Sequence, residues 1–274
     1  MLHLITPLIL TFNEAPNIER TLSRLKWAKE IVVIDSFSTD ETCDLVRKLP
    51  QARILQRKFD SFAEQCNFGL QHIRTEWVLS LDADYLLSEE CVAEVTNLQP
   101  GEEAAGYRAA FKYCMSGSPL RASLYPPRVV LYRRQLAHYR DEGHGHRVQV
   151  EGTILPLRSM IYHDDRKPLD RWLREQDRYA RLEAEYLTRT TGPRDHGTTG
   201  PQDHGTTGPQ DHSLADRIRK KIVLAPGLVF FYTLLGKGLI FDGWPGWFYV
   251  FQRTYAELLL SLRLLEAKLN RTKQ

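Results

Sequence analysis

Apolar runs alternate with helix-like segments over the first third of the chain. Four runs are almost continuously apolar, at Pro7–Phe12, Ile31–Asp35, Ala52–Leu55 and Trp77–Asp82. The segments between them space their apolar residues three or four positions apart, which is typical of amphipathic helices; they are Asn17–Lys26, Glu41–Leu49 and Ser61–Ile73. This alternation predicts βαβ units and an α/β fold with a parallel sheet buried on both faces.

The pattern changes after Asp84, where strands and helices no longer alternate strictly. We expect a helix over Ser88–Leu98, strands over Gly106–Tyr113 and Arg128–Arg133, a loop over Ser116–Pro127, a polar segment over Asp141–Arg147 and a polar helix over Leu169–Leu187. These elements complete a first domain, which we place at residues 1–189.

A tandem repeat separates this domain from the rest of the chain. Residues 190–212 read TTGPRDHG, TTGPQDHG and TTGPQDH. Three copies of Gly, Pro, Thr and polar residues bury too little apolar surface to offset the entropy of ordering, so we expect a flexible linker. The repeat carries His196, His204 and His212 along with it, so these histidines do not by themselves predict a metal site.

The last segment, residues 213–274, is expected to be a helical module. Its uncharged run, residues 222–236, is interrupted by Pro226-Gly227 and is shorter than the roughly 20 apolar residues of a membrane-spanning helix. A following helix carries an apolar stripe, with basic residues off it; the stripe comprises Phe248, Phe251, Tyr255, Leu258, Leu262, Leu265 and Leu269. Two interpretations remain open: a helix at a membrane surface, or a packing helix whose seam joins two copies of the chain.

Charge separates the two parts of the chain. Residues 213–274 hold ten basic and four acidic residues, whereas residues 1–212 hold 27 and 30, and the whole chain carries a formal net charge of +3. A basic, apolar tail favours an anionic membrane surface, and nothing in the composition calls for nucleic acid. We therefore expect a cytoplasmic protein held peripherally or monotopically on the inner face of the cell membrane.

The cysteines and the first residues agree with a reducing compartment. Cys43, Cys66, Cys91 and Cys114 lie more than twenty residues apart without a CxxC pair, which favours free thiols over a zinc site or a disulfide framework. Met1–Phe12 lacks a charged leader and a small-residue cleavage site, so it reads as a first strand and not as a signal peptide.

Polar residues follow the apolar runs, at the points where the predicted strands end. The first run leads into Asn13-Glu14, the second ends at Asp35, and the fourth ends in Asp82-Ala83-Asp84. Ligands of such sheets bind at the carboxyl ends of the strands, so these residues should meet at one edge. Two carboxylates at positions i and i+2 can share Mg²⁺ or Mn²⁺ with a nucleoside diphosphate.

Three stretches of the sequence resemble a known family. They are TFNEAPNIERTLSRLKWAKEIVVIDSFSTDET, FAEQCNFGL and EWVLSLDAD, and they are similar to the nucleotide-binding half of family 2 inverting glycosyltransferases, above all the small lipopolysaccharide-core glucosyltransferase type. The resemblance covers about residues 6–165. It implies the GT-A fold, a Rossmann-like mixed sheet with flanking helices, and transfer of a sugar from a nucleotide-sugar donor.

The resemblance also implies roles for individual residues. Asp84 would ligate Mg²⁺ or Mn²⁺ together with Asp82 and His163. Donor-binding positions carried over from the family motifs are Thr11, Asn13, Glu14, Asp35, Ser38, Asp40, Asn67, Asp82 and, through the YPxR motif, Arg128. The chain departs from the family at Phe37 and Glu41, where glycines are usual, and at Cys66, where a basic residue commonly precedes the asparagine.

An inverting transfer needs a base that takes the proton of the attacking hydroxyl. Relatives often carry a His-Glu pair in the region that here reads YRDEGHGHR, residues 139–147. This chain lacks that pair, and the base is left open among Glu142, His144 and His146.

We therefore expect an inverting hexosyltransferase that acts on a glycan, a lipid-linked acceptor or a lipopolysaccharide-type acceptor. A polyprenyl-phosphate glycosyltransferase is the alternative within enzymes, because a phosphate acceptor needs no strong base. A non-catalytic protein that binds a nucleotide-sugar as a scaffold is the alternative outside them.

Overall fold

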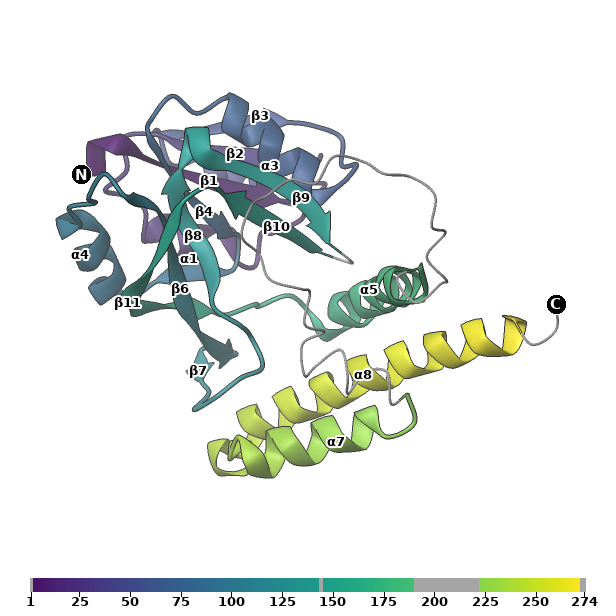
Figure 1. The fold of residues 1–274 in the computed structure, drawn as a ribbon. Helices are drawn as coiled ribbons and strands as arrows, with labels where there is room; N and C mark the ends of the chain where they lie inside the picture. The colour runs from purple at the N-terminus through teal and green to yellow at the C-terminus, as the bar shows by residue number, and fades with distance from the viewer. Residues whose placement is uncertain (1, 143–144, 190–221, 272–274) are drawn as a thin grey trace.

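The first half of the molecule is a parallel sheet with helices between its strands. The computed structural model describes residues 2–142, 145–189 and 222–271. Strands β3, β2, β1 and β4 lie side by side in that order, and all are parallel. The strands are β1 (Ile5–Thr11), β2 (Ile31–Asp35), β3 (Ala52–Gln56) and β4 (Trp77–Asp82), and the helices are α1 (Ile18–Ser23), α2 (Thr42–Arg47) and α3 (Phe62–Gln71). The βαβ arrangement predicted from the apolar runs is confirmed (Figure 1).

The second half extends the same sheet with mixed directions. Beyond β4 the order is β8, β6, β11 and β5. Strand β11 is parallel to β6, whereas β8 and β5 are antiparallel to their neighbours. The elements are β5 (Tyr85–Leu87), α4 (Glu89–Asn97), β6 (Ala104–Met115), β7 (Ser118–Pro119), β8 (Arg128–Arg133), β11 (Thr153–His163) and α5 (Leu169–Arg189). This is the mixed sheet with flanking helices that the GT-A resemblance implied.

Alternate residues of the parallel strands fill two cores, one on each face of the sheet. On β1, Ile5 and Ile9 point to the face covered by α1, α2 and α4, whereas Leu8 points to the face covered by α3. Strand β2 divides in the same way, with Val33 on the first face and Ile34 on the second. Near-continuous apolar runs are the consequence of this burial on both sides.

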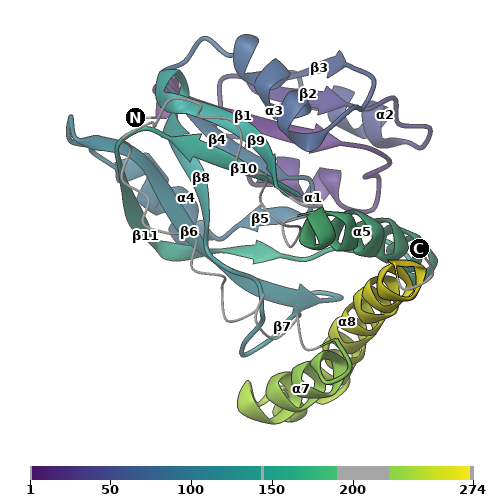
Figure 2. The same cartoon turned by 45° about the vertical axis from the view of Figure 1, so that its right-hand side comes forward.

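A two-stranded hairpin covers part of the second face. It consists of β9 (Ala137–Glu142) and β10 (Gly145–Val150), which are antiparallel (Figure 2). Tyr139 is buried in the same core as α3, and its hydroxyl donates to Ser80 on β4 at 2.8 Å. The polar segment Asp141–Arg147 was expected without a helix or strand; its described residues belong to the two strands, Asp141 and Glu142 to β9 and Gly145–Arg147 to β10.

The C-terminal part forms a helical hairpin. Helix α7 (Ala225–Phe231) continues into a π-helical turn over Tyr232–Gly236, and α8 (Gly243–Arg271) returns beside it. The predicted interruption of a helix at Pro226-Gly227 is wrong. Pro226 lies in the first turn of α7, where its missing N–H needs no partner. The apolar helix also starts earlier than the stripe from Phe248 indicated.

Gly246 allows the helical hairpin to close. A Cβ atom there would lie 2.0 Å from the carbonyl oxygen of Leu239, in the 3₁₀ turn Leu239–Asp242. A glycine at this close backbone approach is what lets α8 start directly against the preceding turn.

Helix α8 packs onto the first domain at two places. Leu260 and Leu264 share a buried cluster with Ala184 of α5, and Arg263 pairs with Asp177 at 2.6 Å. Figures 1 and 2 show α5 alongside α8 at this contact.

The second contact lies near the start of α8. Its Tyr249 packs against Tyr113 of β6, with ring centroids 5.0 Å apart, and the Tyr249 hydroxyl accepts a hydrogen bond from the Leu124 amide at 2.8 Å. Asp242, just before α8, pairs with Arg121 at 2.8 Å. The loop after β6 is therefore held by the last helix.

Candidate active site

The carboxyl ends of β1, β2 and β4 meet at one edge of the sheet. Thr11 is paired with Asp35 across β1 and β2, and Leu10 is paired with Asp82 across β1 and β4. The residues that follow these ends therefore lie close together, as their positions after the apolar runs predicted.

Asp35 is a buried carboxylate in a full set of hydrogen bonds. Its Oδ1 accepts from the hydroxyls of Thr11 at 3.0 Å and Ser38 at 2.5 Å. Its Oδ2 accepts from the Ser38 amide at 2.9 Å and from Gln56 at 3.2 Å. Burial alone would raise the pKa of Asp35, but the hydrogen bonds from Ser38 lower it below its usual value. The group is thus an ionised, fixed anchor of the loop that follows β2.

The loops after β1 and β2 hold each other. The Asn13 amide donates to the Ser38 hydroxyl at 2.8 Å, and Asn13 Oδ1 accepts from the Thr39 amide at 2.7 Å. Asp40 Oδ2 accepts from the Ala15 amide at 3.2 Å. The fold therefore brings together three residues that were predicted to bind the donor: Asn13, Ser38 and Asp40. Some of their hydrogen-bonding atoms are used to hold the two loops together.

Phe37 keeps a glycine-like backbone in this loop. Its φ is +60°, a value that glycine adopts without strain and bulky residues rarely take. The Phe37 side chain is 53% exposed. The departure from the family glycine therefore adds an exposed aromatic ring at a position whose backbone conformation glycine adopts without strain.

Asp84 and His163 form a buried pair beside this edge. Asp84 Oδ2 lies 3.3 Å from His163 Nε2 and 3.8 Å from Lys167 Nζ. Burial alone would raise the pKa of Asp84, but His163 and Lys167 hold it below its usual range. Burial alone would lower the pKa of His163, and the charge of Asp84 raises it instead. Each group of the pair therefore stabilises the charged form of the other.

Two buried atoms of this pair lack a hydrogen-bond partner among the described residues: Asp84 Oδ1 and His163 Nδ1. A buried polar atom without a partner is costly, and it points to a ligand that completes the site. The described residues contain no cluster of three or more His, Cys, Asp or Glu side chains arranged to hold a metal ion. One carboxylate and one imidazole nevertheless fit Mg²⁺ or Mn²⁺ when a diphosphate supplies the other oxygens.

Three tyrosines surround the His163 ring. The ring centroids of Tyr113, Tyr125 and Tyr85 lie 4.6, 4.7 and 5.2 Å from that of His163. The hydroxyls of Tyr85 and Tyr125 share a hydrogen bond, and the Arg128 guanidinium lies 4.9 Å from the Tyr125 ring centroid. Arg128 thus packs on Tyr125, whose hydroxyl is hydrogen-bonded to that of Tyr85, the residue after Asp84. The positive charge of Arg128 therefore lies near the carboxyl ends of the parallel strands.

Sequence reasoning missed several charged residues that complete the cluster. Lys167 Nζ lies 3.1 Å from Glu14 and 3.3 Å from Asp165, and Arg171 lies 3.6 Å from Glu14. Burial raises the pKa of Glu14 to about 7, against the opposing charge of Lys167. The signal was present as the charged run DDRK directly after His163.

Two groups of predicted residues lie apart from this cluster or outside the described residues. The Asn67 side chain donates to the carbonyl of Tyr139 at 3.0 Å and accepts from its amide at 2.9 Å, so it anchors β9, and its donor contact stays a prediction. His144 and the side chains of Glu142 and His146 are not described. The backbone of Glu142 ends β9 and that of His146 lies at the start of β10, whereas His144 lies outside the described residues.

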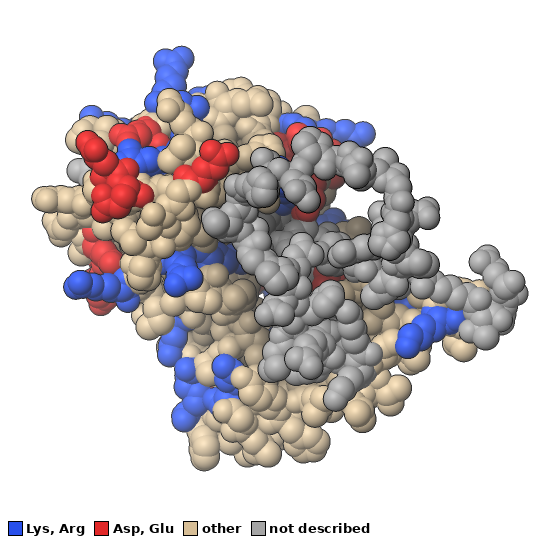
Figure 3. All heavy atoms as spheres, viewed as in Figure 1, with Lys and Arg blue, Asp and Glu red and all other residues tan. Residues whose placement is uncertain are grey.

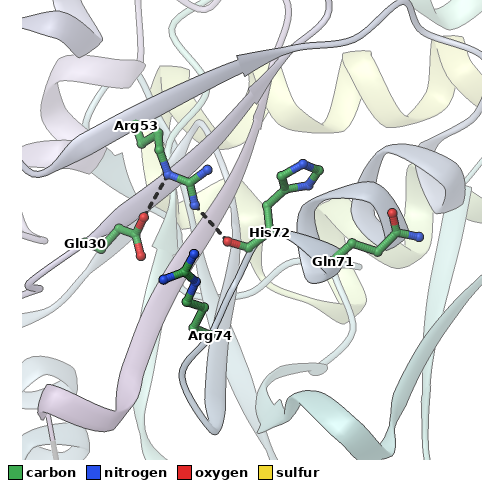
Figure 4. A pocket seen from close by; sticks show the side chains of 5 residues that line it. All are labelled: Glu30, Arg53, Gln71, His72 and Arg74. Atoms are coloured by element: carbon green, nitrogen blue, oxygen red, sulfur yellow. Dashed lines mark hydrogen bonds and ion pairs between the residues drawn. The ribbon is translucent and has the colours of Figure 1, made fainter.

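A cavity of about 490 Å³ lies at the opposite edge of the sheet. Figure 4 shows its lining, which comes from the amino ends of β2, β3 and β4 and from the carboxyl end of α3: Glu30, Arg53, Gln71, His72 and Arg74. Arg53 is already paired with Glu30 at 2.8 Å and donates to the His72 carbonyl at 2.7 Å. The cavity contains none of the predicted site residues, and we assign it no function.

The chain matches one protein-family model and is similar to known protein sequences and solved structures. The model of the family described as glycosyl transferase family 2 matches residues 8–151. An uncharacterized glycosyltransferase of Rickettsia bellii is 32% identical over 106 residues, which are 38% of this chain and 36% of that protein. A lipopolysaccharide core biosynthesis glycosyltransferase of Rhizobium meliloti, LpsC, is 30% identical over 135 residues, 47% of each chain. The matched segments span less than half of these relatives.

Solved structures with a similar chain path include residues 1–349 of S. aureus TarS. Its TM-score is 0.44 at 17% identity, with 98% of this chain and 92% of that chain covered. The glucosyl-3-phosphoglycerate synthase of Mycobacterium tuberculosis in complex with phosphoglyceric acid has a TM-score of 0.46 at 17% identity, with 70% and 81% covered.

Proposed function

The chain belongs to glycosyl transferase family 2, and on this premise we propose that it moves a sugar from a nucleotide-sugar donor to a lipid-linked or lipopolysaccharide-type acceptor, with inversion at the anomeric carbon. The observation that carries the proposal is the buried Asp84–His163 pair, in which Asp84 Oδ1 and His163 Nδ1 have no hydrogen-bond partner among the described residues. The interlocked loops around Asp35 supply a rigid donor site beside it.

In the proposed reaction, different residues of the site hold the nucleoside, the diphosphate with its metal ion, and the acceptor proton. Asp35, Ser38 and Asn13 hold the nucleoside end of the donor, and Asp82 lies towards the ribose. Asp84 and His163 would hold Mg²⁺ or Mn²⁺, which supplies a Lewis acid for the negative charge that develops on the departing diphosphate. Arg128 adds positive charge on the same side. A base on the β9–β10 hairpin takes the proton of the attacking hydroxyl.

Thermal unfolding with candidate donors tests the proposal. We expect one of UDP-, GDP- or dTDP-sugars to raise the melting temperature, and to raise it further with Mn²⁺. A ligand at 100 times its Kd stabilises the native state by about 2.7 kcal/mol, and each kcal/mol is worth about 2–4 °C in a protein of this size. ATP with Mn²⁺ serves as the control. No shift with any sugar nucleotide, in protein that unfolds cooperatively, would contradict the proposal.

The acceptor side of the proposal rests on the helical hairpin. The outer side chains of the hairpin are apolar and exposed, with Trp244 86% exposed; they include Val223, Leu224, Leu228, Phe231, Leu235, Phe241, Trp244, Phe248 and Phe251. An apolar hollow of about 380 Å³ continues this surface between Met115 and Trp247. Figure 3 shows little acidic charge over α7 and α8. Asp242, at the start of α8, is neutralised by Arg121.

We propose that this surface rests on an anionic phospholipid membrane. No single helix among the described residues is long and apolar enough to cross a membrane, although residues 225–236 and 239–270, bent by 68°, pass that test as a pair. Exposed aromatic side chains favour the membrane interface, and each nearby Lys or Arg adds about 1 kcal/mol on an anionic surface. A membrane-bound enzyme of this kind would take its acceptor from the lipid.

Flotation with vesicles tests this placement. Burying a large apolar side chain contributes about 1.5–3 kcal/mol, so the double change Phe241→Ser, Trp244→Ser should lower binding to anionic vesicles by roughly tenfold or more. Met160→Ser, an exposed apolar residue on β11, is the matched control. Unchanged flotation, or a discrete oligomer in solution that the double change dissociates, would overturn the membrane assignment in favour of a seam between copies.

A further inference from the structure

Lys167 is a buried ammonium group among three carboxylates. Its side chain is 10% exposed, and its Nζ lies 3.1 Å from Glu14, 3.3 Å from Asp165 and 3.8 Å from Asp84. A buried cation persists only where such partners offset the loss of its hydration. In this arrangement the ammonium supplies the positive charge that the three carboxylates require.

The turn that carries Lys167 is fixed on both sides. Asp164 accepts from Arg20 at 2.7 Å and from the Gly117 amide at 3.0 Å. Asp165 accepts from the Asn17 side chain at 2.9 Å. These contacts hold the segment between β11 and α5 against α1, so the position of Lys167 is set by the fold and not by a free side chain.

His163 and Lys167 approach the same oxygen of Asp84. The distances to Oδ2 are 3.3 Å from His163 Nε2 and 3.8 Å from Lys167 Nζ. A divalent cation held by Asp84 would therefore lie close to a fixed positive charge, and like charges at such distances repel strongly in a buried site. The metal and the ammonium compete for the same negative charge.

We propose that Lys167 is an internal counter-ion, which occupies the carboxylate cluster in the donor-free enzyme and makes the entry of the divalent cation depend on the donor. The inference rests on the proposed function, because a nucleoside diphosphate is what relieves the competition. Its phosphates bring negative charge to both cations, and lysine is a common phosphate partner. Metal and diphosphate then raise each other's affinity by the same factor, as linkage requires.

Binding of Mn²⁺ alone tests the proposal, measured by electron paramagnetic resonance of the free ion. Lys167→Met keeps the length of the side chain and removes its charge, and we expect it to bind Mn²⁺ about tenfold or more tightly than the native protein. Lys167→Arg should bind Mn²⁺ as weakly as the native protein. Lys29→Met, an exposed lysine after α1, is the matched control.

A second measurement repeats the titration with UDP, GDP or dTDP. The ratio of Mn²⁺ affinities with and without nucleotide should be smaller in Lys167→Met than in the native protein. If Lys167→Met does not fold, Lys167→Met with Glu14→Gln removes one charge of each sign, and it should still bind Mn²⁺ more tightly.

Unchanged affinity for Mn²⁺ alone in folded Lys167→Met, or in the folded double variant where the single change does not fold, would overturn the proposal. Failure of every nucleotide to bind the native protein would instead contradict the proposed function, and the comparison with Mn²⁺ alone would still decide the role of Lys167.

Discussion

Asp84→Asn is expected to abolish sugar transfer while leaving the fold intact. The change keeps the size of the side chain and removes the charge that pairs with His163 and would hold the metal. A metal ion at a departing diphosphate is worth several kcal/mol of transition-state stabilisation, and each 1.36 kcal/mol is a factor of ten in rate. We therefore expect turnover to fall by roughly 10³-fold and the Mn²⁺-dependent part of donor binding to disappear.

Calorimetric titration of the donor with Mn²⁺ and with EDTA measures this effect, and circular dichroism checks the fold. Asp44→Asn is the matched control, since Asp44 lies exposed on α2 and pairs only with the neighbouring Arg47 among the described residues. Donor affinity that keeps its full dependence on Mn²⁺ in Asp84→Asn would remove this residue from the metal site.

The base is the second place where a large loss is expected. Removing a general base typically costs 10²–10⁴-fold, so Glu142→Gln should lower turnover by roughly 10²-fold or more with donor binding retained. If the loss follows His144→Ala or His146→Ala instead, the role belongs to that histidine. The readouts are kcat at saturating donor and the Kd of the donor, measured for each variant.

His138→Ala provides the control within the same hairpin, because His138 is exposed on β9 and lies outside the segment of interest. An unchanged kcat in Glu142→Gln, His144→Ala and His146→Ala would contradict base catalysis from this hairpin. It would favour a polyprenyl-phosphate acceptor, whose phosphate oxygen needs no strong base.

The parallel half of the fold was predictable because burial on both faces leaves a clear pattern. Strand β2, for example, is apolar at every position before Asp35 and ends where the run ends. The hairpin left no such signal, since β9 reads AHYRDE and buries Tyr139 while its neighbours stay polar or exposed. Pro226 was misread because a proline in a first helical turn and a proline at a break look the same in sequence.

The candidate site was predictable where it follows strand ends, and not where the tertiary fold brings in distant residues. Asp35 and Asp84 could be named because each lies just after an apolar run. Lys167 reaches Glu14, and Asp165 reaches Asn17, from about 150 positions away, through the pairing of β11 with β6. That pairing is parallel and joins strands far apart in sequence, so no local sequence pattern predicts it.

The contact of Tyr249 with Tyr113 and Leu124 has a consequence for how this protein can evolve. Tyr113, which belongs to that contact, and Tyr125, which follows Leu124 in the sequence, both pack against His163. Helix α8, the loop 116–127 and His163 therefore form one structural unit, which we expect to be inherited together. The repeat 190–212 is nevertheless a point in the sequence at which recombination would exchange the tail alone. A chimaera that takes α8 from a relative would need the matching loop as well. Changes in the helical hairpin and changes around His163 are thus expected to arise together.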